Sequence, residues 1–152
     1  MHSNLGHVTR LAPGEVDRLI RVHFPFLHAD GRQITIEELA PNLAQLRMTV
    51  NERSLRPDHT ISNAALFELA EAGLLAVLLA ELGETAPRLA ATTLTISFLG
   101  RARALDVLCE ARLLKRGRRL AVGEIELRSA GDPALIGHVT ATCAALPGAV
   151  SR

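Results

Sequence analysis

The sequence predicts an α+β domain in which one antiparallel sheet wraps around a single buried helix. Residues 64–82 are apolar on nearly every side of a helix, and such a helix in a globular protein is buried on nearly every side. After this run, apolar residues recur at every second position in four segments, which is the pattern of half-buried strands. A curved sheet can cover most of the surface of one helix, so the two observations fit together.

The composition of the 152-residue chain is that of a globular protein with its own core, with 48% hydrophobic and 22% charged residues. A net charge of +1 argues against general nucleic-acid binding. Glu68 and Glu71 interrupt the apolar run, which argues against a membrane span because a carboxylate in lipid is strongly unfavourable. No secretory signal opens the chain, so we expect a cytoplasmic protein.

The first part of the chain is predicted to hold a short helix and two strands within a single domain over residues 11–147. Pro13 favours a helix that begins there and continues to Arg21, because proline suits the first helical turn. Alternating residues predict strands around 33–37 and 45–51. The ends of the chain, residues 1–10 and 148–152, are expected to be flexible.

The long helix is predicted to follow a loop at residues 57–60 and to end at about Gly83. Its N-cap is predicted to be Thr60, Ser62 or Asn63, since each of these side chains can accept a hydrogen bond from a free backbone N–H group.

The second half of the chain is predicted to be a meander of four strands, around residues 93–98, 105–113, 121–127 and 135–143. Turn residues separate the later strands, at Arg116-Gly117 and Gly131-Asp132-Pro133. Strands joined by hairpins favour an antiparallel sheet.

The cysteines and histidines suggest no special chemistry. Cys109 and Cys143 lie in apolar alternating stretches, so we interpret them as buried reduced thiols in preference to a disulfide or a reactive thiol. The six histidines show neither an HExxH motif nor clustered spacing, so no metal is indicated.

Residues 60–72, 98–103 and 115–122 carry motifs that resemble those of the hotdog superfamily, most closely of the PaaI-like thioesterases of phenylacetate degradation and related hotdog proteins. Residues 60–72 resemble the motif at the start of the family's helix, Ala-Leu-Phe-x-Leu-Ala followed by an acid. Residues 98–103 are similar to its Phe-Leu-x-Pro-Ala strand end, and residues 115–122 to its basic Gly-Arg hairpin. The resemblance covers about residues 30–147.

This resemblance implies hydrolysis of an acyl-CoA thioester by a homodimer or dimer of dimers, with no cofactor other than the CoA of the substrate. Glu71 takes the position of the family's nucleophile or general base. Asn63 takes that of a glycine whose backbone N–H polarises the thioester carbonyl. The residues expected to bind substrate are Ser62, Ala64, Arg101, Arg103, Arg118 and Arg119.

Other interpretations of these residues remain open. From the residues alone, Glu71 is either an active-site acid or a carboxylate that emerges at a gap in the sheet. The sequence departs from the family at Asn63 and at Leu75, where Ser or Thr is frequent, and this favours a non-catalytic hotdog module that binds acyl or aromatic ligands. A hydroxyacyl-thioester dehydratase-like protein would use Glu68, but the spacing of His59 does not suit that motif. The basic hairpin is either a solvated turn or a contact for CoA phosphates.

The spacing of Asn63 and Glu71 predicts that assembly is part of the mechanism. They are eight positions apart on one helix, which separates them by about 12 Å at about 1.5 Å per residue. No single thioester carbon can touch both, so the N–H donor and the acid must come from different chains.

Overall fold

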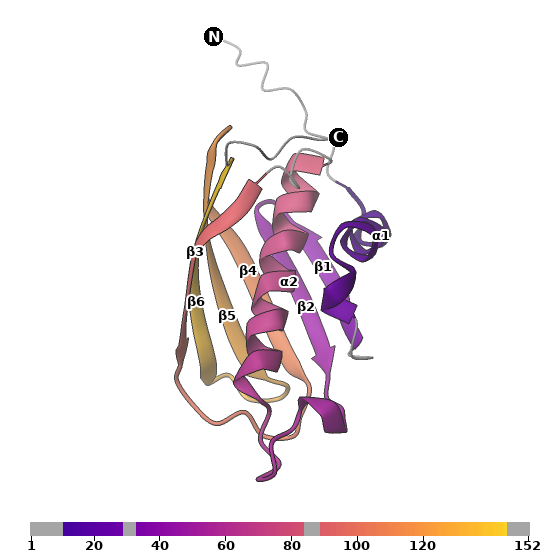
Figure 1. Cartoon of the computed structure of the whole chain (residues 1–152), viewed down its shortest axis with the longest axis vertical. Coiled ribbons are helices and arrows are strands. Elements are labelled where there is room, and N and C mark those ends of the chain that lie inside the picture. The colour runs from indigo at the N-terminus through magenta and orange to yellow at the C-terminus, as the bar shows by residue number, and fades with distance from the viewer. Residues whose placement is uncertain (1–10, 29–32, 84–88, 146–152) are drawn as a thin grey trace.

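The helix predicted from the apolar run lies at the centre of the computed structural model, which describes residues 11–28, 33–83 and 89–145 (Figure 1). The helices are α1 (Pro13–His23) and α2 (Asn63–Leu82), with single 3-10 turns η1 (Pro25–His28) and η2 (Glu52–Ser54). The strands are β1 (Gln33–Ala40), β2 (Leu43–Thr49), β3 (Leu89–Phe98), β4 (Val107–Arg116), β5 (Leu120–Ser129) and β6 (Leu135–Ala145). These elements confirm the predicted α+β class.

The strands form one six-stranded antiparallel sheet in the order β1-β2-β4-β5-β6-β3. The predicted meander is right for β4, β5 and β6 and wrong for β3. Instead of pairing with β4, β3 crosses to the far edge of the sheet and pairs with β6, so that Leu94 faces Ala141. The physical reason is that both edges of β4 are already occupied, by β2 and by β5.

The sheet curves around α2, which packs mainly on β2, β4 and β5, while α1 covers α2 and β1 (Figure 1). Close packing on β4 depends on Gly73, because a Cβ atom there would lie 2.6 Å from the Sγ atom of Cys109 and 3.3 Å from the Cβ atom of Ala111. Cys109 and Cys143 are both buried and free, as predicted. In the described part of the chain, no helix is long and apolar enough to cross a membrane.

Both ends of α2 are fixed by specific contacts. Of the three predicted N-caps, Ser62 is the one used, and its hydroxyl accepts a hydrogen bond from the N–H of Ala65 at 3.1 Å. At the other end the buried carboxylate of Glu81 accepts hydrogen bonds from the backbone N–H of Asn42 at 2.7 Å and from Arg116 at 2.8 Å. These contacts tie the helix to the β1–β2 turn and to the end of β4.

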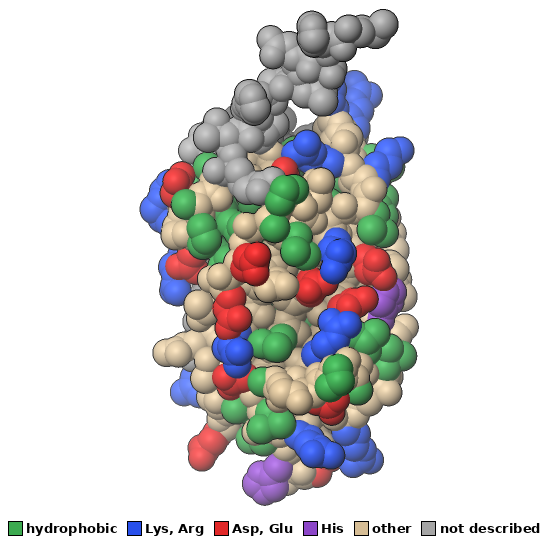
Figure 2. Space-filling model, turned by 180° about the vertical axis from the view of Figure 1, so that it is seen from behind, with side chains coloured by type: hydrophobic (Ala, Val, Ile, Leu, Met, Phe, Trp, Pro, Cys, Tyr) green, Lys and Arg blue, Asp and Glu red, His purple; other side chains and the backbone are tan. Residues whose placement is uncertain are grey.

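The outer face of the sheet carries acidic and basic side chains interspersed with one another (Figure 2). Pairs formed within the chain on this face are Arg47 with Glu37 and Asp106, Arg112 with Glu110, Arg128 with Glu126, and His138 with Glu124. The predicted flexible ends, residues 1–10 and 148–152, lie outside the described residues.

Candidate active site

The start of α2 presents two backbone N–H groups without an acceptor. In the described part of the chain, no group accepts a hydrogen bond from the N–H of Asn63 or Ala64, which occupy the first two positions of the helix. The first N–H groups of a helix have no partner within it, and they carry the positive end of its dipole. Such a pair of donors can stabilise an oxyanion.

The loop before α2 is held in place by backbone hydrogen bonds. The N–H of Ser62 donates to the carbonyl of Ser54 at 2.7 Å, and the N–H of Ile61 donates to the carbonyl of Ala102 at 2.8 Å. The start of the helix is therefore fixed against the segment that joins β3 to β4.

A cavity of about 350 Å³ opens beside this helix start. Asn63 and Leu66 of α2 form one wall, and Phe98 and Arg101 contribute to another. The cavity therefore combines a polar helix start with apolar side chains. Ala64 is exposed close by on the same helical turn.

Glu71 lies two turns further along α2 in an apolar setting. Its side chain is half-buried, and burial raises the pKa of the Glu71 carboxyl above its usual range, with a smaller contribution from the charge of Glu68. Phe67 and Leu75 stand one turn to either side, on the stripe of α2 that the sheet does not cover. None of the described residues donates a hydrogen bond to Glu71. A carboxylate in such a place is a candidate general base or nucleophile.

One chain does not bring the helix start and Glu71 together. Both are on the single helix Asn63–Leu82, so the expected separation of about 12 Å along its axis holds in the structure. A site that uses both groups needs a second chain.

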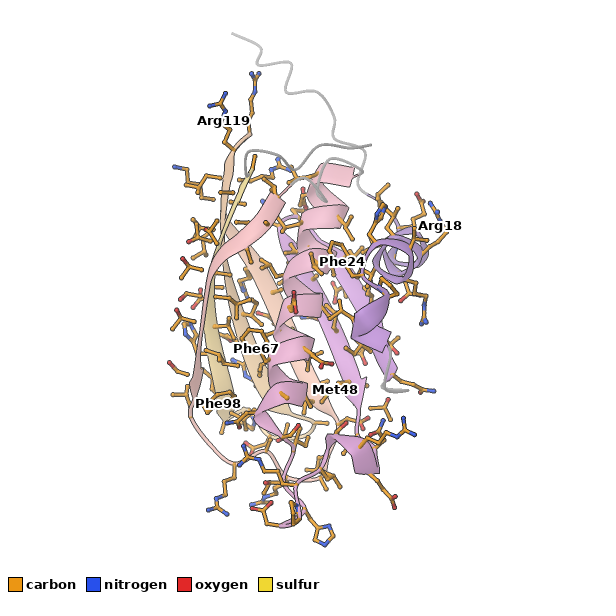
Figure 3. All side chains as sticks on the ribbon, viewed as in Figure 1. Arg18, Phe24, Met48, Phe67, Phe98 and Arg119 are labelled. Atoms are coloured by element: carbon orange, nitrogen blue, oxygen red, sulfur yellow. The ribbon has the colours of Figure 1, made fainter. Side chains whose placement is uncertain are left out.

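The basic residues predicted to bind substrate fall into two groups. Arg101 and Arg103 follow β3, next to the start of α2, while Arg118 and Arg119 lie in the β4–β5 hairpin. Figure 3 places Arg119 at the end of the molecule opposite to Phe98, the last residue of β3. Within one chain, the two groups therefore cannot contact the same small ligand.

Sequence reasoning missed Arg56, which lines the same cavity as Asn63 and Arg101. Its only signal was its place next to Pro57, in the loop that leads into the helix. The Ser62 hydroxyl, predicted to bind substrate, acts as the helix cap. Among the described residues, no group of three or more His, Cys, Asp or Glu side chains could hold a metal ion.

Comparisons with known proteins place the chain in a family and a fold. The family model of the acyl-CoA thioesterase N-terminal domain matches residues 72–144. A candidate thioesterase from Silicibacter sp. TM1040 is 32% identical, with 93% of this chain and 97% of that chain covered and a TM-score of 0.77. No curated protein matches the chain in sequence.

More distant structures share the fold. Thioesterase superfamily member 2 from zebrafish is 19% identical, covers 90% of this chain and 99% of its own, and has a TM-score of 0.76. The PaaI protein from the Escherichia coli phenylacetic acid degradation operon is 17% identical, covers 87% and 94%, and has a TM-score of 0.69.

One antiparallel sheet wrapped around a buried helix is the architecture of a hotdog domain. Because the chain is 32% identical to the Silicibacter protein over nearly the whole of both chains, it belongs to the hotdog-fold thioesterases, which are hydrolases.

Proposed function

We propose that the protein hydrolyses an acyl-CoA thioester as a homodimer, at sites that combine the start of α2 from one chain with Glu71 of the other. The observation that carries this proposal is the pair of free N–H groups at Asn63 and Ala64 beside a cavity. The half-buried Glu71 supplies the second chemical group that such a reaction needs.

The chemistry follows from these two groups. The thioester carbonyl oxygen accepts hydrogen bonds from the free N–H groups, which stabilise the negative charge that develops on it. Glu71 then acts in one of two ways. As a base, it takes a proton from water while the water oxygen attacks the carbonyl carbon. As a nucleophile, it attacks that carbon itself, and water hydrolyses the resulting anhydride. In both cases the carbon–sulfur bond breaks and CoA leaves as the thiol.

The edge of the sheet at β3 supports the dimer. Within the described chain β3 pairs only with β6, so its second edge presents ten residues of backbone that can pair with another strand. The uncovered stripe of α2, with Phe67 and Leu75, is a further surface for a partner. A two-fold axis that pairs β3 with the partner's β3 would also set the two α2 helices antiparallel. If the axis passes near Phe67, midway between Asn63 and Glu71, each helix start faces the partner's Glu71.

Two substitutions at Asn63 test the oxyanion site. Asn63→Pro removes the N–H group and keeps the helix, because proline is favoured at the first helical position and Ser62, at φ −65° and ψ 148°, already has the extended conformation that must precede it. We expect kcat to fall by about 100-fold or more with Asn63→Pro. The matched variant Asn63→Ala keeps the N–H group and should keep most of the turnover.

Mixing chains tests whether the site is shared. Glu71→Gln should be inactive by itself, as should Asn63→Pro, yet a heterodimer of the two contains one intact site. A refolded one-to-one mixture should therefore recover about a quarter of the parent rate, since half of the dimers are heterodimers. No recovery would contradict a site shared between the two chains.

Further variants separate the alternatives. Glu68→Gln should leave turnover largely intact, and loss of activity there would favour a dehydratase-like use of Glu68. If Glu71→Gln releases thiol from a panel of acyl-CoA substrates as fast as the parent does, the protein is instead a non-catalytic hotdog module that binds acyl or aromatic ligands.

A further inference from the structure

Three arginines meet at the end of the molecule where α2 begins. Arg56 lies in the loop before the helix, and Arg101 and Arg103 lie in the segment between β3 and β4. The N–H of Arg56 donates to the carbonyl of Thr60 at 2.7 Å, and Thr60 forms an isolated antiparallel bridge with Arg103. The hydrogen bond from Ile61 to Ala102 closes the same junction. These backbone contacts make one platform of the two loops, which we call the arginine platform (Arg56, Arg101 and Arg103).

The arginine platform lies over two neighbouring cavities. Arg56 and Arg101 line the cavity of about 350 Å³ that also contains Asn63. Arg101 and Arg103 line a second cavity of about 260 Å³, which reaches the β5–β6 turn at Asp132. Arg101 therefore stands between two spaces, only one of which adjoins the free N–H groups of α2.

Two carboxylates face the arginine platform, and neither neutralises it fully. Asp58 lies 3.7 Å from a guanidinium nitrogen of Arg101. Its pKa is lowered mainly by hydrogen bonds from Thr60, with smaller contributions from the charges of Arg101 and Arg56. The carboxylate of Asp132 accepts a hydrogen bond from the N–H of Ala134 at 2.9 Å.

The platform keeps an excess of positive charge. Neither Arg56 nor Arg103 forms an ion pair within 4.0 Å with a described residue, and the Arg101 side chain is 86% exposed. Three guanidinium groups therefore face two carboxylates, and an anion can reach them from solvent.

We infer that the arginine platform binds the phosphates of CoA, with the 5′-diphosphate at Arg56 and Arg101 and the 3′-phosphate at Arg103. This inference rests on the proposed function for the direction of the substrate. With the thioester carbonyl at the start of α2, the pantetheine arm leaves through the first cavity, and its phosphates emerge between Arg56 and Arg101. The planar guanidinium group suits phosphate because it donates two parallel hydrogen bonds.

Asp58 acts in this arrangement as a counter-ion that the diphosphate displaces from Arg101. Its hydrogen bonds from the N–H and hydroxyl of Thr60, at 3.0 and 2.6 Å, keep the carboxylate in the loop when Arg101 turns to the ligand. Asp58 therefore opposes binding, and its removal should strengthen binding.

The experiment measures binding of CoA and of dephospho-CoA, which lacks the 3′-phosphate, by calorimetry in the Glu71→Gln background. Arg56→Gln should weaken the binding of both ligands by about tenfold. Arg103→Gln should weaken CoA by about as much and leave dephospho-CoA unchanged, and Asp58→Asn should tighten both. The Asn side chain can still accept hydrogen bonds from Thr60 through its oxygen, so the loop is preserved.

The rival phosphate site is the β4–β5 hairpin, because an antiparallel dimer would bring the partner's hairpin to the end of the molecule that carries the platform. Arg118→Gln combined with Arg119→Gln removes the two cations of this rival site and should leave both affinities unchanged. If the hairpin pair weakens CoA while Arg56→Gln and Arg103→Gln do not, the phosphates bind at the hairpin and the inference is overturned. Equal loss of both ligands with Arg103→Gln would overturn the assignment of the 3′-phosphate. Because CoA binding needs no turnover, these outcomes are independent of whether Glu71 catalyses hydrolysis.

Discussion

Glu71 shows at the scale of one residue how a candidate catalytic group reduces the stability of the fold. Burial raises the pKa of this carboxyl, so the folded state favours its protonated form. The stability that this preference contributes is fully present below the ordinary pKa of a glutamate and is lost as the pH rises through the raised value. At neutral pH the folded protein therefore holds a charged group in a setting that disfavours it.

Glu71→Gln should consequently raise the free energy of unfolding at pH 7, while at about pH 4 the difference from the parent should nearly vanish. Urea denaturation of both proteins at the two pH values is the measurement. Glu68→Gln, one turn away, is the matched control. If Glu71→Gln is less stable than the parent at pH 7, the charged form of Glu71 does not destabilise the folded protein. Equal gains at both pH values would show that charge is not its cause.

At the scale of elements, the distance between α2 and β4 decides how far Glu71 stands from the sheet. Gly73 follows Glu71 by two residues and faces Cys109 and Ala111 of β4, with no room for a Cβ atom. The sulfur cannot swing far, because Cys109 is itself buried and close to the carbonyl of Leu69 at 3.8 Å. The helix position is therefore set by the absence of one methyl group.

Gly73→Ala should lower the free energy of unfolding by about 1–3 kcal/mol through overpacking, although alanine has the better helix propensity. Cys109→Ala removes the sulfur, so the double variant should recover part of this loss and give a coupling energy of about 1 kcal/mol. Gly14→Ala in α1, where a Cβ atom would meet nothing within 4 Å, should be neutral or stabilising. Strictly additive effects of the two core substitutions in urea denaturation would contradict the contact.

At the scale of the whole molecule, two surfaces differ in how many of their polar groups find a partner among the described residues of the chain. The outer face of the sheet pairs many of its charges within the chain (Figure 2). Among the described residues, the β3 edge leaves backbone groups unpaired, and β3 runs on the side of α2 toward which Phe67 points (Figure 3). An unpaired strand edge presents backbone N–H and C=O groups that can pair with a strand of another chain, so we expect the dimer interface there.

Lysines on that edge test the assembly. Thr93→Lys combined with Thr95→Lys places charges at two exposed positions of β3, where a two-fold axis would bring like charges together. We expect sedimentation to show monomers and thiol release to fall with the loss of dimers. Gln33→Lys, exposed on the opposite edge strand β1, is the control and should leave both unchanged. An active monomer would contradict the shared site.

The sequence by itself determined the elements and their class. The apolar run of α2 and the alternation of the later strands depend on short-range periodicity, so the helix start, Gly83 at its end and three strands of the meander were predicted within a few residues. The resemblance also proposed Glu71 and Asn63 as site residues, because motif residues keep their spacing along one helix, and these roles stay predictions.

Only the tertiary structure decided which elements are neighbours. The place of β3 beside β6 depends on which strand edges remain free, and no local pattern encodes that. The convergence of Arg56 with Arg101 and Arg103 likewise needs two loops, distant in sequence, to be joined by backbone hydrogen bonds. The distance of Arg118 and Arg119 from that platform also depends on long-range structure, because the pairing of β4 with β5 puts their hairpin at the other end of the sheet. Periodicity determines which face of an element is buried, whereas long-range pairing determines which faces and loops meet.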